Sequence, residues 1–453
     1  MKKKVLATIL AAAMTLSMVA CAAAPAAEAP AAPAAEPAAE EEAAPVEEEA
    51  PAAEAETVDA AEPAAESFDL TMWCIATESD SNRHSYEAAI EEVTAAHPEI
   101  NFTWEAIENE AYKTKIKAAV AADDMPDIFF TWSCAFLGDF VDAGRVYCLD
   151  DEYANWSADL PEVMTGNTTY NGSHYGVPLT MNIVGLFANM DILAEVGYEE
   201  VPGTYEEFIA CCDKLVEAGY YPFGCAGKET WCVTEYLESV IEKSIGADAL
   251  NDIFLGRATW NNPDVAAAVD TFQGMVTNGY FDPSGEALSN DEVKQNFIDG
   301  KYAFYMNGTW NCADFSNAGI NCKVAEFPVI NAEAAKLGQL IGGPSDTLAV
   351  AASSEHAAEA AAFTFELGKA ICHYGYLDGC GLPAWTPDYD TSAINPLTNA
   401  VSDICANADS YVLFGDTAQN ADDAATYLDY VAQVYGCEVD GQGFIEGLAA
   451  DIR

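Results

Sequence analysis

Strand and helix patterns alternate from residue 70 onward, and this alternation limits the folds open to the chain. Residues 70–75, 100–106 and 128–132 have the apolar patterns of strands. Between them, residues 86–93 and 112–120 carry apolar side chains at helical spacing. Strands that alternate with helices favour a largely parallel sheet covered by helices. The order therefore predicts an α/β fold.

Helices dominate the rest of the chain. Thr204 with Glu207 reads as a capping box that opens a helix, and a further helix has Val265, Val269, Phe272 and Val276 on one face. Residues 347–352 form a further strand, which a helix follows to about residue 369, and the last 60 or so residues look helical. We find no internal repeat.

The N-terminus has the features of a targeting segment. Lys2, Lys3 and Lys4 precede an apolar stretch, residues 5–19, that is too short to be a convincing membrane span. The stretch ends in Met-Val-Ala-Cys, which resembles a bacterial lipobox. We therefore predict that residues 1–20 are a lipoprotein signal peptide and that Cys21 carries lipid; the alternative is an ordinary cleavage site with an incidental cysteine.

An acidic, low-complexity tract follows the predicted signal peptide. Between Cys21 and Ser67 there are 12 Glu and one Asp, with no Lys or Arg, among many Ala and Pro residues. Such a segment buries too little apolar surface to offset its ordering entropy, and its charges repel each other. We predict that residues 21–66 are a disordered tether.

The charge balance excludes some partners. The chain has 18 Lys and Arg against 74 Asp and Glu, a formal net charge of −56. This argues against nucleic acid and against direct contact with an anionic membrane surface. The lipid anchor would be the only membrane contact. Acidic charge alone does not indicate a cationic ligand, because much of it is simply solvated.

The 14 cysteines do not indicate a disulfide scaffold or a metal site. Removing Cys21 leaves 13 in a domain large enough to need no covalent staples. There is no paired CxxC motif and no His/Cys spacing typical of zinc. We predict mostly buried free thiols, with room for one or two disulfides, and neither metal nor cofactor.

The segment GKYAFYMNGTW, residues 300–310, is the main candidate for a ligand contact. Gly300 ends a helical pattern, residues 301–306 read as a buried strand, and Asn307-Gly308 is a turn signal. Trp310 then lies at a strand-to-helix junction that Thr309 can cap. Ligands of α/β proteins bind at the carboxyl ends of strands. The alternative is that Trp310 belongs to the core.

Six segments in order resemble one family. They are MPDIFF at 125–130, YGVPL with LFANMDIL at 175–193, VPGTYEEF at 201–208, GKYAFYMNGTW at 300–310, GGPSDTLAV at 342–350 and CGLPAW at 380–385. Together they resemble the family 1 extracellular solute-binding proteins of ATP-binding-cassette importers, the family that includes the maltose-binding protein. The resemblance spans residues 67–453.

The resemblance implies a two-lobed, periplasmic-binding-protein-like fold of type II. Each lobe would be a mainly parallel sheet flanked by helices, and solute would bind in the cleft between them. By this analogy lobe 1 comprises residues 67–179 with 347–382, and lobe 2 comprises residues 182–344 with 384–453.

The resemblance also implies a carbohydrate site. A sugar has apolar CH faces and a rim of hydroxyls, so its site needs flat aromatic rings and planar polar groups. Trp310 matches the family's sugar-stacking Trp. Glu229 and Trp231 resemble an acid-x-aromatic contact, with a surface loop as the alternative. Trp132 and Ser133 follow a strand at a common contact position, although Trp132 can equally shield the strand end.

The resemblance also implies segments that cross between the lobes, near residues 180–183, 344–347 and 382–384, and the remaining candidates lie near these crossings or near the first strand. Asn182 occupies a crossing position where the maltose-binding protein has Glu, and its amide can still bind two hydroxyls. Glu78 and Asp80 follow the first strand and can accept hydroxyl protons, unless they form a solvated loop. Three more residues border the other crossings, the last with core packing as its alternative: Ser345, Asp346 and Trp385.

These features predict a monomeric, lipid-anchored receptor outside the cytoplasmic membrane. It would bind a mono- or oligosaccharide, close over it, and deliver it to a permease of the importer. One alternative is the same fold with a polyamine or other non-sugar solute, held by acidic and aromatic groups. A secreted glycoside hydrolase would need two spaced carboxylates, and no catalytic motif is present. A sensory receptor would share every feature given above.

Overall fold

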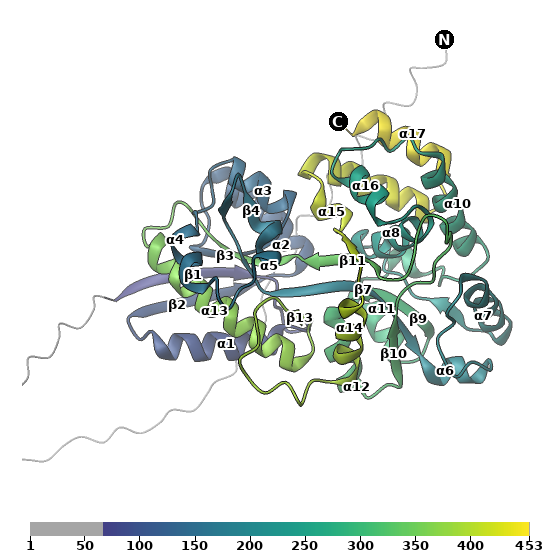
Figure 1. The fold of residues 1–453 in the computed structure, drawn as a ribbon, viewed down its shortest axis with the longest axis horizontal. Coiled ribbons are helices and arrows are strands. Elements are labelled where there is room, and N and C mark those ends of the chain that lie inside the picture. The colour runs from purple at the N-terminus through teal and green to yellow at the C-terminus, as the bar shows by residue number, and fades with distance from the viewer. Residues whose placement is uncertain (1–66, 453) are drawn as a thin grey trace, which may run out of the picture. The chain divides into compact units, whose positions relative to one another are not determined.

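The computed structural model describes residues 67–452, which lie within one compact unit, residues 64–453. The predicted signal peptide, the lipidated Cys21 and the tether lie outside the described residues. The described chain forms two main sheets, each with its own hydrophobic core. We call each sheet with its helices a lobe (Figure 1).

The first lobe contains the predicted β-α-β-α-β order. Its five-stranded sheet has the order β2-β1-β3-β12-β6, and β1 is parallel to both β2 and β3. The strands are β1 (Phe68–Cys74), β2 (Ile100–Ala106), β3 (Ile128–Trp132), β6 (Val177–Pro178) and β12 (Asp346–Val350). The strand β12 runs antiparallel to β3 and β6 because the chain returns to this sheet from the second lobe.

Helices cover the first sheet because apolar side chains repeat along one face of each. The helix α1 buries Tyr86, Ala89, Ile90 and Val93 on one side, and it packs against α13. Figure 1 shows α13, far along the chain, among the elements of this lobe. The helices are α1 (Arg83–Ala96), α2 (Asn109–Ala122), α3 (Ala135–Asp142), α4 (Asp150–Trp156), α5 (Glu162–Thr165) and α13 (Ala357–Asp378), and a short hairpin pairs β4 (Thr169–Tyr170) with β5 (Ser173–His174) after η1 (Gly166–Thr168).

The sheet of the second lobe is mixed rather than mainly parallel. Its central strand β7 runs antiparallel to β9, β10, β11 and β13, whereas β8 with β9 and β11 with β14 are parallel. The chain enters β7 directly from β6, without the helical crossover that parallel neighbours need, so β7 can run antiparallel to the strands beside it. The strands are β7 (Thr180–Asn189), β8 (Tyr221–Phe223), β9 (Tyr302–Gly308), β10 (Cys322–Ala325), β11 (Gln339–Pro344), β13 (Leu382–Pro383) and β14 (Ser410–Val412).

The second lobe is rich in helices, as the sequence predicts. Thr204 caps α7, its side chain accepting a hydrogen bond from the Glu207 amide, and residues 265–276 fall within α10. The helices are α6 (Met190–Glu195), α7 (Tyr205–Ala218), α8 (Trp231–Ile245), α9 (Ala247–Phe254), α10 (Pro263–Thr277), η2 (Gly285–Ala287), α11 (Asn290–Ile298), η3 (Thr309–Asn311), α12 (Cys312–Ala318), α14 (Pro396–Ala406), α15 (Gly415–Ala418), α16 (Ala421–Tyr435) and α17 (Gly441–Asp451).

Three connections join the lobes side by side. The chain passes from β6 to β7 through Leu179, from β11 to β12 through Ser345, and from α13 to β13 near Gly381. The start of β7 pairs with the end of β11 and with β13, so all three connections meet at Met181. This arrangement brings the ends of both sheets to one place.

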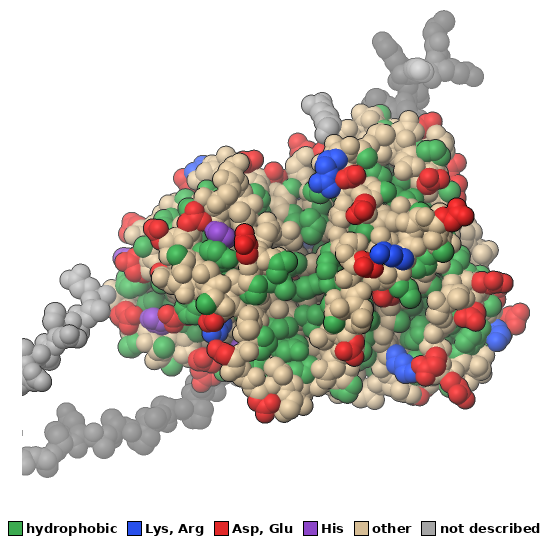
Figure 2. Space-filling model, viewed as in Figure 1, with side chains coloured by type: hydrophobic (Ala, Val, Ile, Leu, Met, Phe, Trp, Pro, Cys, Tyr) green, Lys and Arg blue, Asp and Glu red, His purple; other side chains and the backbone are tan. Residues whose placement is uncertain are grey.

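The described residues contain no disulfide. All 13 of their cysteines are free, and eight are buried. No described helix has the length and apolar character to cross a bilayer. Figure 2 shows Asp and Glu side chains scattered over the viewed face, with few Lys and Arg side chains among them.

Candidate ligand-binding site

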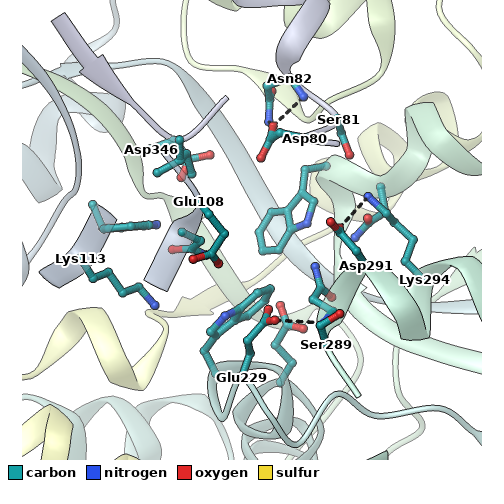
Figure 3. A pocket seen from close by; sticks show the side chains of 18 of the residues that line it. Asp80, Ser81, Asn82, Glu108, Lys113, Glu229, Ser289, Asp291, Lys294 and Asp346 are labelled. Atoms are coloured by element: carbon teal, nitrogen blue, oxygen red, sulfur yellow. Dashed lines mark hydrogen bonds and ion pairs between the residues drawn. The ribbon is translucent and has the colours of Figure 1, made fainter. Parts of the chain in front are cut away.

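A cavity of about 390 Å³ lies between the two lobes. The first lobe lines it with the loop after β1, the start of α2, the end of β3 and the connection into β12. The second lobe contributes the start of α8, the start of α11, η3 and the segment around α15. Figure 3 shows Asp80 and Asn82 on one side of this space, with Glu229 and Ser289 on the opposite side.

Aromatic rings from both lobes face the cavity. Trp310 contacts Trp231, with ring centroids 6.2 Å apart, and Phe414 at 6.4 Å. On the first lobe, Trp132 packs edge-on against Phe130 and lies beneath the ammonium group of Lys113, 5.2 Å from the ring centroid. The site therefore offers flat apolar surfaces from opposite directions.

The ring of Trp310 lies in space that a side chain at position 308 would fill, and residue 308 is a glycine. The strand β9 ends at Gly308, and Trp310 follows in η3. A Cβ atom on Gly308 would lie 2.1 Å from Cζ3 of the Trp310 ring. Gly308 has φ −63° and ψ 149°, which any residue adopts. Glycine is needed here for the ring and not for the backbone.

Carboxyl groups of the first lobe border the cavity. The Asp80 Oδ1 atom accepts hydrogen bonds from the Asn82 backbone at 2.8 Å and from its side chain at 3.3 Å. Burial raises the pKa of Asp80. Burial likewise raises the pKa of Asp346 to about 6, although Thr180 donates a hydrogen bond to its carboxylate. Glu108 caps α2 by accepting from two backbone amides.

Charged groups of the second lobe are held in place by their neighbours. Glu229 accepts a hydrogen bond from the Asn290 amide at 3.3 Å, and burial raises its pKa. Lys294 forms ion pairs with Asp314 at 2.8 Å and with Asp291 at 3.7 Å. Burial alone would lower the pKa of Lys294, but the nearby carboxylates raise it overall.

Within residues 67–452, several buried polar atoms of cavity-lining residues have no hydrogen-bond partner. They are both carboxyl oxygens of Glu235, Oδ1 of Asn311, Oδ1 of Asn109 and Nε1 of Trp231. Asn311 and Glu235 are each only 1 % exposed. Buried polar groups are nearly always paired, with protein or with ordered water, so these atoms mark where a ligand or water bonds.

Comparison with known proteins identifies the family of this chain. Residues 79–364, well over half of the chain, match the model of a family described as bacterial extracellular solute-binding protein. The chain belongs to that family. The six segments in the sequence therefore predicted the family correctly.

Two curated relatives of this solute-binding protein are named for sugars. The maltotriose-binding protein of Pyrococcus abyssi is 23 % identical over 252 residues, 54 % of this chain and 51 % of the relative, so the match spans about half of that protein. The multiple sugar-binding protein of Streptococcus mutans is 24 % identical over 361 residues, 74 % of this chain and 80 % of the relative. Both are named as binding proteins rather than enzymes.

Solved structures share the fold. A structure from work on xylan utilisation by Caldanaerobius polysaccharolyticus is 30 % identical, with a TM-score of 0.82, covering 85 % of this chain and 100 % of its own. A chitin oligosaccharide binding protein is 20 % identical, with a TM-score of 0.78, covering 85 % of this chain and 98 % of its own. The two-lobed α/β fold is thus the fold of the family.

Seven of the eleven residues that the sequence singled out line the cavity. They come from five different parts of the chain, and the fold brings them together from both lobes. They are Asp80, Trp132, Glu229, Trp231, Trp310, Ser345 and Asp346.

The other four lie outside the cavity for identifiable reasons. Ser133 is fully buried and donates to the Pro344 carbonyl at 3.0 Å. Asn182 is 1 % exposed and joins Thr309 to Thr180 by hydrogen bonds. The Glu78 side chain is 89 % exposed and pairs with Arg83.

Trp385 belongs to the core of the first lobe and does not wall the cavity. It is 3 % exposed, packs against Trp156 and Phe365, and donates from Nε1 to the Pro178 carbonyl at 2.9 Å. Its polar atom is thereby satisfied within the lobe.

Sequence reasoning found seven of the 26 residues that line the cavity and missed the other 19. Two of them had a local signal: Asn311 adjoins Trp310, and Glu235 lies one helical turn after Trp231. The others lie on segments without a recognised motif, and they include Glu108, Asn109, Lys113, Asn290, Asp291, Lys294, Phe414 and Asp416.

Proposed function

We propose that this solute-binding protein is a carbohydrate receptor. The observation that carries the proposal is the set of indole faces, Trp310 with Trp231 on one lobe and Trp132 on the other, around a cavity rimmed by carboxyl and amide groups. Flat rings suit the CH faces of a sugar, and planar polar groups suit its hydroxyls. The volume of about 390 Å³ lies within the range of roughly 300–1,000 Å³ typical of small-molecule sites.

The receptor would work outside the cytoplasm as one part of an importer. Closure of the lobes over the sugar would present a changed surface to a membrane permease, and opening there would release the sugar. Residues 21–66 would act as the tether and Cys21 as the lipid anchor, with the protein acting as a monomer. The names of the relatives support the sugar, and the extracellular family supports the location.

A cationic solute such as a polyamine is the second candidate. Seven acidic residues line the cavity against three lysines, namely Asp80, Glu108, Glu229, Glu235, Asp291, Asp346 and Asp416 against Lys113, Lys228 and Lys294. A surplus of carboxyl groups beside aromatic rings favours a cation. Burial raises the pKa of Asp80, Glu229, Glu235 and Asp416, however, and this lowers their tendency to carry charge.

A thermal-shift screen of the purified full-length protein tests the proposal. Maltotriose, xylotriose, raffinose and spermidine serve as probes. A ligand at 100 times its Kd stabilises the fold by roughly 2.7 kcal/mol, which gives a readable shift in Tm. We expect at least one saccharide to raise Tm, and Trp310→Ala to abolish that rise.

Trp104→Ala is the matched control, because Trp104 is also partly buried but lies outside the cavity and packs against Arg83. It should leave the saccharide shift intact. A shift with spermidine alone would reject the sugar and retain a cationic solute. Consumption of a saccharide during the assay would show an enzyme instead of a receptor.

A further inference from the structure

Helix α8 carries three buried glutamates along one face. Glu235, Glu238 and Glu242 follow one another at spacings of three and four residues, and they are 1 %, 0 % and 1 % exposed. Each has at least one carboxyl oxygen that finds no hydrogen-bond partner among the described residues. Glu235 alone of the three lines the cavity.

Glu238 and Glu242 have other partners. Glu238 accepts hydrogen bonds from the Tyr427 hydroxyl at 3.0 Å and the Gly415 amide at 3.2 Å, which anchors α15 against α8. Glu242 forms an ion pair with Lys243 at 3.1 Å. Neither carboxyl oxygen of Glu235 has a hydrogen bond of regular geometry within the described chain, although the nearby Gly308 backbone has a small stabilising effect on its charge.

The groups around Glu235 are acidic or neutral. Its main electrostatic neighbours are Glu238 on its own helix and Asp416 on α15, and both disfavour a second negative charge. The positive charges of Lys113 and Lys117 on α2 oppose the rise that burial causes in the pKa of Asp416. Four other titratable groups lie near Glu235, and each has a raised pKa: Cys225, Cys232, Tyr236 and Tyr305. The charge of Glu229 also raises the pKa of Cys232.

A carboxylate ion in these surroundings is unfavourable. Burial removes its hydration, no cation of the described chain forms an ion pair with it, and two acids repel it. Burial, followed by the charges of Glu238 and Asp416, raises the pKa of Glu235 well above its usual range. The group therefore keeps its proton at a pH where exposed glutamates are ionised.

We propose that Glu235 is a neutral carboxylic acid that determines ligand specificity, giving one hydrogen bond to a sugar hydroxyl and accepting another. A protonated carboxyl has one donor and one acceptor, and a hydroxyl is the neutral group that meets both. An ammonium ligand would require the ionised form instead. The inference rests on the proposed carbohydrate function.

Two polar atoms of other cavity-lining residues, one on Asn311 and one on Trp231, could bond to the same ligand. The amide nitrogen of Asn311 is held by Asn307 at 2.8 Å and by the Gly308 carbonyl at 3.0 Å, so its unpaired oxygen is left as an acceptor. Nε1 of Trp231 is a donor that has no partner within the described residues. A sugar ring presents hydroxyls that can serve all three groups.

Calorimetric titration of the full-length protein between pH 5 and pH 9 tests the inference, with maltotriose, xylotriose and raffinose as probes. Glu235→Gln keeps a donor and an acceptor but cannot ionise. We expect it to match the native affinity at pH 5 within about threefold. Native affinity should fall relative to the Gln variant as the pH rises, approaching about tenfold per pH unit once Glu235 ionises. Glu235→Ala should weaken binding at pH 5 at least about tenfold, equal to roughly 1.4 kcal/mol.

Glu242→Gln is the matched control, because Glu242 shares the helix face but does not line the cavity. It should keep the native pH profile. Should Glu235→Gln fail to fold, proton uptake by the native protein, measured in buffers of different ionisation enthalpy, reports the same linkage. One proton taken up per saccharide at high pH supports the inference, and none overturns it.

The outcomes separate this inference from the proposed function. Loss of binding by Glu235→Gln at pH 5, a constant ratio of native to variant affinity, or native affinity that rises with pH would each overturn the neutral acid while sugar binding stands. If no saccharide binds to the native protein at any pH, the proposed function itself fails.

Discussion

Asp346 shows how one residue couples the site to the stability of the fold. It lies directly after Ser345, where the chain passes from the second lobe into β12, and its side chain borders the cavity. Its carboxylate accepts hydrogen bonds from Thr180 at 3.1 Å and Ser345 at 3.4 Å. No ion pair in the described part of the chain compensates its charge, so the fold favours its protonated form.

We expect Asp346 to make stability depend on pH. Burial raises its pKa from 3.8 to about 6. Below about pH 4 the carboxyl is mostly protonated in both the folded and the unfolded protein, so it has little effect on the free energy of unfolding. Above pH 6 it is ionised in both, and the buried charge then lowers the free energy of unfolding most. Asp346→Asn should therefore be more stable than the native protein at pH 7.5, by up to about 3 kcal/mol, and no more stable at pH 4. Urea unfolding at both pH values measures the difference.

The exposed Asp151, changed to Asn, is the control for this series, and it should track the native protein at both pH values. Equal stability of the native and Asp346→Asn proteins at pH 7.5 would contradict the expectation.

Among the elements, the end of β9 determines where the aromatic face of the site lies. The sequence predicts a turn at Asn307-Gly308, but both residues belong to the strand and pair with β7. The Asn307 side chain accepts hydrogen bonds from the Gly308 amide at 2.9 Å and from Asn311 at 2.8 Å. A side chain that normally signals a turn thus organises η3 instead.

Gly308→Ala should weaken sugar binding while leaving the fold intact. The backbone of Gly308 suits alanine, but the new Cβ would lie 2.1 Å from the Trp310 ring and displace it. We expect affinity to fall about tenfold, roughly 1.4 kcal/mol, with little change in Tm. Titration of the saccharide found in the screen, together with thermal melts, measures both.

Gly274→Ala on α10 controls for the added methyl group, since nothing lies within 4 Å of the position. Unchanged affinity in Gly308→Ala would show that the ring position does not matter for binding.

At the scale of the whole molecule, hydrogen bonds between the lobes add to the three stretches of chain that connect them. The Ser81 hydroxyl donates to Asp314 at 2.8 Å beside the cavity. Farther away, the Asp139 carboxylate on α3 accepts from the Ala421 amide at 3.0 Å, at the start of α16. A carboxylate at a helix N-terminus is favoured by the helix dipole. Both bonds require the lobes to be close together.

Asp139→Ala should weaken sugar binding although Asp139 does not line the cavity. The bond stabilises the closed arrangement, and its loss, about 1 kcal/mol, should lower affinity roughly fivefold. Titration calorimetry measures the affinity, and small-angle X-ray scattering should show a larger radius of gyration for the variant. The exposed Asp142 on the same helix, changed to Ala, should retain native affinity; the same affinity in both variants would contradict the role of the bond.

The sequence alone determined the features that depend on local pattern. The strand and helix order of the first lobe, the family and the aromatic residues at strand ends all follow from periodicity and short motifs. Trp310 was found because a strand-to-helix junction is visible in the chain itself, Trp132 because it follows a strand, and Trp231 because its segment resembles a family motif.

Only the tertiary structure decided which polar groups meet in the cavity. Asn182 and Trp385 left the candidate set because distant partners, Thr309 and Pro178, bury and satisfy them. Glu235 entered it because β9 and α15 enclose it without a cation. Burial and charge compensation depend on segments far apart in sequence, and those are brought together only by the packing of the two lobes.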